Sequence, residues 1–94
     1  MQLEDDAEAL DLRARISALD RQVLELVNER LRVVEELWRL KAERGYATVD
    51  ASREERMLAE LEAANGGPLT REGVQELQRE LLALTKRERA RAAD

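Results

Sequence analysis

The sequence predicts an all-α chain of three helices, of which the first is very long. Charged residues make up 39% of the 94 residues and aromatic residues only 2%, a balance typical of long, solvent-exposed helices. Strong helix breakers gather at two places, Gly45 and the run 65–68. Between these breakers, apolar residues recur every three or four positions. We expect helices at about 5–44, 51–64 and 70–90, within a single domain of residues 1–94.

The first helix begins behind acidic residues that suit the positive end of its dipole, and it ends at Gly45. One line of residues on this helix keeps a four-three spacing without a slip. This line consists of Leu12, Ile16, Leu19, Val23, Leu26, Arg30, Val33, Leu37 and Leu40. A second line beside it consists of Arg13, Ser17, Asp20, Leu24, Val27, Leu31, Val34, Trp38 and Lys41. Together the two lines form a face that is too wide for one short partner helix.

The two shorter helices carry their own start signals. Asp50 or Ser52 can cap the second helix, since residues 52–55 have the pattern of a capping box. Thr70 is the predicted cap of the third helix. The expected inner face of the second helix consists of Asp50, Glu54, Met57, Leu58 and Leu61. That of the third consists of Val74, Leu77, Gln78, Leu81, Leu82, Thr85 and either Glu88 or Arg89.

The length of the first helix predicts a homodimer. About 40 residues make a rod of roughly 60 Å, whereas a compact chain of this size has a radius of gyration of about 12 Å. The two shorter helices are not long enough to cover the apolar face of such a rod. A second copy of the chain can cover it, so we expect an obligate homodimer built on paired long helices.

The composition excludes several classes of function. Without cysteine or histidine there is no disulfide, thiol nucleophile, imidazole base or zinc site of the usual ligands. A net charge of −5 argues against nucleic acid or an acidic membrane surface as a partner. No apolar run is long enough to span a bilayer, and the acidic N-terminal segment does not resemble a signal peptide. We therefore expect a cytoplasmic protein without metal or cofactor.

Three basic residues stand on the apolar face of the first helix. Arg30 occupies a position where the spacing calls for an apolar residue, and Arg13 and Lys41 close the second line at its two ends. Each of them alone is explained by an internal salt bridge or by a side chain that reaches from the core edge into water. Three cations on one face of an acidic protein favour a small anion site inside a helical bundle.

Polar residues of the other two helices complete this candidate site. Glu54 lies at the polar end of an apolar stripe, where an ion pair with Arg30 or Lys41 is the simpler explanation. The simpler explanation for Asp50 is a helix cap, and the simpler explanation for Arg53 is a solvated surface charge. Gln78 and Thr85 interrupt the third helix's inner face, although a Thr inside a helix often bonds its own backbone. With no nucleophile available, such a site works by positioning and charge stabilisation.

The motifs that carry these residues resemble a known family. Residues 12–20 (LRARISALD), 26–30 (LVNER) and 40–42 (LKA) resemble the first helix of the all-helical chorismate mutases. Residues 50–54 (DASRE) resemble the start of that family's second helix, and the resemblance runs from about Leu10 to Arg89. The turn at 67–69 (GPL), leading into 74–77 (VQEL), is similar to the mutase domain fused to the N-terminus of some bacterial DAHP synthases.

This resemblance implies the chorismate mutase II fold, an intertwined dimer of three-helix chains. It also implies an isomerase of the shikimate pathway, which converts chorismate to prephenate on the route to phenylalanine and tyrosine. The reaction is an intramolecular Claisen rearrangement and needs no cofactor, metal or nucleophile. The substrate carries two carboxylates, which suits a cationic pocket.

The resemblance assigns the two substrate carboxylates to arginines. Arg13 is implied to reach across the dimer interface into the partner chain's pocket and hold one carboxylate. Arg30, from the chain that forms the pocket, is implied to hold the other. Arg53 and Thr85 are implied to assist.

The remaining implied contacts concern the ether oxygen and the ring hydroxyl. Lys41 is implied to donate to the ether oxygen, which gains negative charge as the C–O bond breaks. Glu54 and Asp50 are implied to hold the hydroxyl, Asp50 through its backbone. Arg89 stands where the family usually has Gln or Glu for a second ether-oxygen contact; it either makes that contact or points into solvent.

Three other functions remain open from the sequence. One is a regulatory domain that binds chorismate or prephenate, has weak activity, and controls a fused or associated DAHP synthase. Another is isochorismate-pyruvate lyase, which uses much the same cations on the same scaffold. The last is a purely structural helical dimer in which Arg30 and Lys41 pair only with protein carboxylates.

Overall fold

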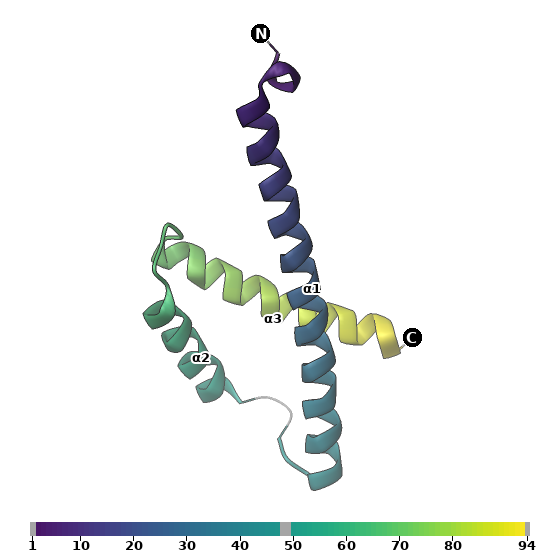
Figure 1. The fold of residues 1–94 in the computed structure, drawn as a ribbon. Helices are drawn as coiled ribbons and strands as arrows, with labels where there is room; N and C mark the ends of the chain where they lie inside the picture. Colours follow the sequence, from purple (N-terminus) through teal and green to yellow (C-terminus); the bar gives the residue numbers. More distant parts are fainter. Residues whose placement is uncertain (1, 48–49, 94) are drawn as a thin grey trace. The chain divides into compact units, whose positions relative to one another are not determined.

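The computed structural model describes residues 2–47 and 50–93 and is all-helical over these ranges. A 3-10 turn at Leu3–Asp5 precedes three α-helices, α1 (Ala7–Arg44), α2 (Ala51–Ala64) and α3 (Arg71–Ala93) (Figure 1). The predicted all-α class with a very long first helix is therefore confirmed. The outermost residues of the expected domain, Met1 and Asp94, lie outside the described residues. The chain divides into two compact units, Met1–Gly45 with α1 and Tyr46–Asp94 with α2 and α3.

Helix α1 is a single uninterrupted helix of 38 residues, about 57 Å long. It begins at Ala7, two residues after the expected start, because the Asp6 side chain caps it. One carboxylate oxygen of Asp6 accepts the backbone N–H groups of Glu8 and Ala9 at 3.0 and 3.2 Å. The helix ends where predicted, at Gly45, whose φ of 71° is left-handed and whose N–H donates to the Lys41 carbonyl.

The apolar face of α1 is exposed in the single chain. Its large side chains are between 44% and 64% exposed at Leu10, Leu12, Ile16, Leu19, Val23, Leu24, Leu26 and Val33. A row of exposed apolar side chains of this kind is unfavourable in water and is typical of an interaction surface. Among the described helices, none combines enough length with enough apolar character to cross a membrane.

Helix α2 begins directly after Asp50, which is its N-cap. One Asp50 carboxylate oxygen accepts the backbone N–H groups of Ser52 and Arg53 at 3.1 and 3.2 Å. Ser52 lies inside the first turn and donates its hydroxyl to the same Asp50 oxygen at 2.7 Å. The alternative in which Ser52 caps the helix is therefore wrong, because the helix starts at Ala51, two residues too early for it.

Helices α2 and α3 pack against each other as a hairpin. Asn65 ends α2 and orders the turn: its amide nitrogen donates to the Leu69 carbonyl at 2.7 Å, and its amide oxygen accepts the Gly67 N–H at 3.0 Å. The hydroxyl of Thr70 accepts the Gly73 N–H at 3.0 Å, so the predicted cap of α3 is confirmed. Helix α3 continues to Ala93, three residues beyond the expected end.

Little of the described chain is fully buried. Val74 (4% exposed) and Gln78 (5%) are the two buried residues among those with described side chains, and both lie on α3. Leu77, which was predicted on the inner face of this helix, is 49% exposed. Within the single chain, few apolar side chains of the described residues are therefore fully removed from water.

Candidate active site

The three cations of the candidate site all lie on α1. Arg13 is exposed, whereas Arg30 and Lys41 are half-buried. The ammonium nitrogen of Lys41 lies 5.6 Å from the centroid of the Trp38 ring, within the range of a cation–π interaction. This contact holds the lysine head against the helix that carries it.

The spacing of these cations along one straight helix limits which of them can meet. Lys41 follows Arg30 by eleven residues, which is about three turns, so both lie on the same face about 17 Å apart along the axis. Arg13 precedes Arg30 by seventeen residues, about 26 Å along the axis and about 100° around it. Arg30 and Lys41 of one chain can therefore flank a small ligand from two sides, but Arg13 of that chain cannot reach it.

Asp50 already uses its carboxylate to cap α2. The hydrogen bond from the Ser52 hydroxyl, followed by those from the Arg53 and Ser52 backbone, lowers the pKa of Asp50 below its ordinary value. The Asp50 carbonyl accepts the Glu54 N–H at 3.2 Å as the first bond of the helix, and a carbonyl oxygen has a second lone pair. If Asp50 contacts a ligand, its backbone is the part that remains able to do so.

Arg53 and Glu54 occupy the first turn of α2. The Arg53 side chain is exposed, and its Nη1 contacts the sulfur of Met57, one turn further along the helix. Glu54 is half-buried. The cap at Asp50 thus brings a carboxylate and a guanidinium to one end of the hairpin.

On α3, Thr85 and Arg89 lie one turn apart, and both are half-buried. The Thr85 hydroxyl donates to the Leu81 carbonyl at 2.7 Å, as is common for threonine inside helices. With its hydrogen donated there, the Thr85 oxygen faces a ligand only as an acceptor, unless the side chain rotates. Glu88, beside Arg89, forms an ion pair with Arg91 at 3.1 Å.

A groove of about 370 Å³ runs between α2 and α3. Glu54 and Leu58 of α2 line it together with Gln75, Gln78 and Leu82 of α3. Its volume falls within the range of small-molecule sites. Glu54 therefore shares this groove with Gln78, a residue predicted only as a polar interruption of the inner face.

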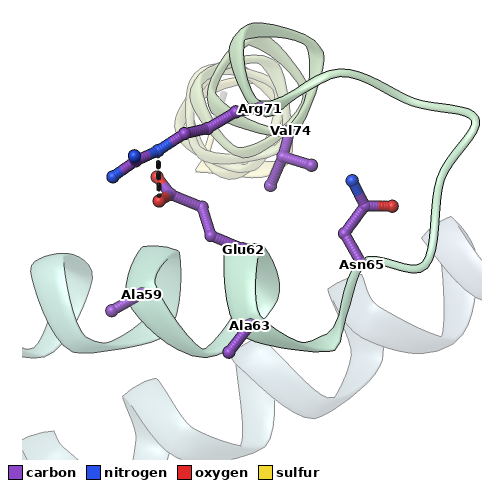
Figure 2. Close-up of a pocket in the computed structure, with 6 residues that line it drawn as sticks. All are labelled: Ala59, Glu62, Ala63, Asn65, Arg71 and Val74. Carbon is purple, nitrogen blue, oxygen red and sulfur yellow. Dashed lines mark hydrogen bonds and ion pairs between the residues drawn. The ribbon is translucent and has the colours of Figure 1, made fainter.

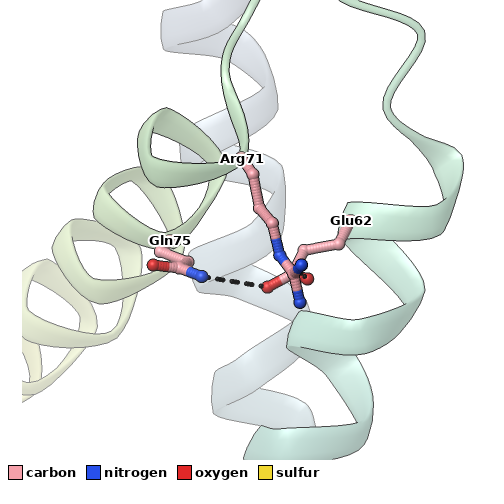
Figure 3. Close-up of polar contacts among 3 residues, drawn as sticks. All are labelled: Glu62, Arg71 and Gln75. Atoms are coloured by element: carbon pink, nitrogen blue, oxygen red, sulfur yellow. Dashed lines mark hydrogen bonds and ion pairs between the residues drawn. The ribbon is translucent and has the colours of Figure 1, made fainter.

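A second hollow of about 390 Å³ lies at the turn between the two helices (Figure 2). None of the eight predicted site residues lines it; its lining consists of Ala59, Glu62, Ala63, Asn65, Arg71 and Val74. Sequence reasoning missed the ion pair at its edge, in which Arg71 Nε donates to a Glu62 oxygen at 2.8 Å. Gln75 adds a longer bond to Glu62 at 3.4 Å (Figure 3). No local pattern predicts these contacts, because they join residues of different helices.

The comparisons with known proteins address the chain as a whole. The family described as chorismate mutase type II matches residues 12–90. Two structures of chorismate mutase from Thermus thermophilus, Form I and Form II, are each 37% identical to the chain, with TM-scores of 0.79. Both comparisons cover 83% of this chain, and they cover 98% and 89% of the respective Thermus chains. Among curated proteins no match is found. With more than four-fifths of its length matched, the chain belongs to the chorismate mutase type II family.

Proposed function

We propose that this chorismate mutase, an isomerase, rearranges chorismate to prephenate at a site that two copies of the chain build together. The family match carries this proposal, because residues 12–90 include all eight of the predicted site residues. In the rearrangement the ether C–O bond breaks while a C–C bond forms within the same molecule. The protein therefore has to hold a flexible dianion in its compact conformer and to stabilise the charge that develops on the ether oxygen.

The dimer follows from what one chain leaves uncovered. The row of exposed apolar side chains on α1, described above, needs a long partner, and a second α1 has the matching length and character. Pairing two such helices along their apolar faces removes both from water. In this arrangement the two units of each chain fold as one domain within the intertwined dimer.

Arginines of both chains hold the substrate carboxylates in this proposal. Arg30 binds one carboxylate from the chain that forms the pocket, and the separation along α1 requires Arg13 to come from the other copy. Arg53 supports them from the first turn of α2. Thr85 assists by rotating its hydroxyl away from the Leu81 carbonyl, which it bonds in the single chain.

The remaining residues act on the reacting half of the substrate. Lys41, which is half-buried beside Trp38, donates to the ether oxygen. Arg89 supplies a second cation to the same oxygen from the end of α3. Glu54 accepts a hydrogen bond from the ring hydroxyl, and the Asp50 backbone completes the surroundings of that hydroxyl. Removal of one donor of this kind typically costs about 3 kcal/mol, or roughly a hundredfold in rate.

The loss of chorismate absorbance should be measured for the wild type and Lys41→Ala, with the product identified by chromatography. We expect prephenate from the wild type and a roughly hundredfold lower rate from the variant. Arg39→Ala is the matched control, since Arg39 is an exposed cation of the same helix outside the predicted site. Absence of prephenate with the wild type would refute the proposed function.

Mixed dimers test whether the site is shared. Arg13→Ala and Lys41→Ala chains are each expected to be impaired, and mixing them should restore activity at the one site that receives both intact residues. No recovery after verified subunit exchange would place each site within one chain. Light scattering gives a second test, because a monomer mass at micromolar concentration contradicts the dimer.

The turn at 67–69 supports a closer relationship to the mutase domains fused to DAHP synthases. We therefore propose a DAHP synthase as the partner that this domain regulates when it binds chorismate or prephenate. Size-exclusion chromatography with that enzyme, with and without prephenate, tests the association.

The proteins named in the comparisons are mutases, so the lyase reaction is not favoured. Incubation with isochorismate tests this. A cytoplasmic location remains a prediction.

A further inference from the structure

Gln78 is a buried amide on α3 that the chorismate mutase mechanism proposed above does not use. It is 5% exposed, and its Nε2 has no hydrogen-bond partner within the described ranges 2–47 and 50–93. A buried donor left unsatisfied is unfavourable, and an apolar side chain of the same size would avoid this cost. Leu58 and Leu82, which line the same groove, show that apolar residues fit there.

Gln75, one turn earlier on α3, differs from Gln78 in the hydrogen bonding of its amide nitrogen. Gln75 also lines the groove, but its Nε2 donates to Glu62 at 3.4 Å. The two glutamines have the same chemistry and neighbouring positions, yet only one amide nitrogen is used by the protein. The Gln78 amide is therefore available to donate to a ligand in the groove.

Gln78 lines the same hollow of about 370 Å³ as Glu54 of α2. A carboxylate accepts hydrogen bonds and cannot donate, whereas a hydroxyl group both donates and accepts. Glu54 therefore satisfies the hydrogen of a hydroxyl, whereas the hydroxyl oxygen has two lone pairs that need donors from elsewhere. The amide nitrogen of Gln78 can supply such a donor, in addition to the Asp50 backbone contact proposed above.

We propose that Gln78 is a specificity-determining residue, whose amide donates to the oxygen of the substrate hydroxyl that Glu54 accepts from. This inference rests on the proposed function and adds one residue to it. Its consequence is a preference for the hydroxyl-bearing ring over the same ring without the hydroxyl. A site that hydrogen-bonds a hydroxyl rejects the analogue lacking it, because its polar groups are then left unpaired.

The test is a cycle of two enzymes and two substrates. We would measure kcat/KM of the wild type and of Gln78→Met, each with chorismate and with an analogue whose ring hydroxyl is replaced by hydrogen. The wild type should prefer chorismate, and Gln78→Met should reduce this preference by about fivefold to tenfold, the worth of one hydrogen bond. Because each substrate is compared with itself across enzymes, its intrinsic reactivity cancels.

Gln75→Met is the matched control, since it makes the same chemical change at an amide that Glu62 already occupies. Its substrate preference should stay within about twofold of the wild type, a change far smaller than one hydrogen bond. An unchanged preference in Gln78→Met, or an equal change in both variants, would overturn the inference while prephenate formation by the wild type keeps the proposed function. Absence of wild-type turnover would overturn both.

Thermal unfolding at fixed protein concentration separates recognition from a structural role. A glutamine kept for binding should be replaceable by Met or Leu with no loss of thermal stability, because the unsatisfied amide disappears. If the fold needs this glutamine, both Gln78→Met and Gln78→Leu should instead lower the midpoint of thermal unfolding. That result, together with an unchanged substrate preference, would assign Gln78 to the fold.

Discussion

The ion pair between Glu62 and Arg71 is the best-defined contact between α2 and α3. One Glu62 oxygen accepts from Arg71 Nε at 2.8 Å, and the other accepts from Gln75 at 3.4 Å (Figure 3). The two partners differ sharply in exposure, since the Glu62 side chain is 18% exposed and that of Arg71 is 76% exposed. We therefore expect the pair to stabilise the hairpin modestly. Removing Arg71 should cost more stability than removing the charge of Glu62.

The exposure of Arg71 determines how much the ion pair stabilises the hairpin. Water and salt screen an arginine of this kind, so the interaction itself is worth about 0.5–1 kcal/mol, the upper part of the range for surface pairs. Arg71→Met leaves the carboxylate largely buried with only the long Gln75 bond, which should raise the loss to about 1–2 kcal/mol. Glu62→Gln removes the charge but keeps an oxygen that can accept from the exposed Arg71 guanidinium, so it should cost about 1 kcal/mol or less.

A double-mutant cycle measures these values. Glu62→Gln, Arg71→Met and the double variant are unfolded in urea at one fixed protein concentration, because the stability of a dimer depends on concentration. The double variant should lose less than the sum of the single losses, by about 0.5–1 kcal/mol. Repetition in about 1 M salt should shrink this coupling, since screening acts within about 3 Å at that ionic strength.

Two results would refute this reasoning. Additive losses would show that the close contact contributes no coupling. A coupling that is unchanged in high salt would show that the pair acts through packing or through a neutral hydrogen bond. Glu76→Gln is a suitable control, because Glu76 is an exposed carboxylate on the same helix outside this contact.

Three further predictions concern single positions. The lowered pKa of Asp50 means that its cap stabilises the folded chain above the ordinary value of 3.8 and is lost as the pH falls through the lower folded value. Helicity followed by circular dichroism between about pH 5 and pH 2 should show this loss, and Asp50→Asn, which caps without titrating, should lack it. Gly45→Ala should destabilise by about 1 kcal/mol, because φ at Gly45 is 71°; urea unfolding checks this, and Gly45→Asn should lose less. Arg89→Ala should lower kcat by roughly a hundredfold if Arg89 donates to the ether oxygen, whereas Arg91→Ala should not; equal rates in both would remove Arg89 from the mechanism.

The helix ends that sequence analysis predicted well are those decided by one residue. Gly45 ends α1 because no other residue adopts a left-handed φ as readily, and Thr70 caps α3 because its hydroxyl replaces a missing backbone partner. The start of α2 remained ambiguous because Asp50 and Ser52 are equally good caps by type. Helix α3 continues past its predicted end because residues 86–93 contain no breaker that would stop it.

Contacts between helices were beyond sequence analysis for a different reason. The Glu62–Arg71 pair depends on how the hairpin turn directs α3 against α2, and no local spacing encodes that direction. Leu77 follows the apolar spacing of α3 and is nevertheless 49% exposed, because periodicity predicts a face but not what covers it. The chemistry of the candidate site was predicted from residue types, and the resemblance supplied their individual roles.

The unbroken course of α1 limits where residues can be inserted into or deleted from this chain. One residue inserted between Arg30 and Lys41 would rotate everything beyond it by about 100° and carry Lys41 off the face it shares with Arg30. Seven inserted residues would nearly restore the face but add about 10 Å to the separation. We therefore expect insertions and deletions to be tolerated better in the connections around Gly45 and Gly66 than inside α1.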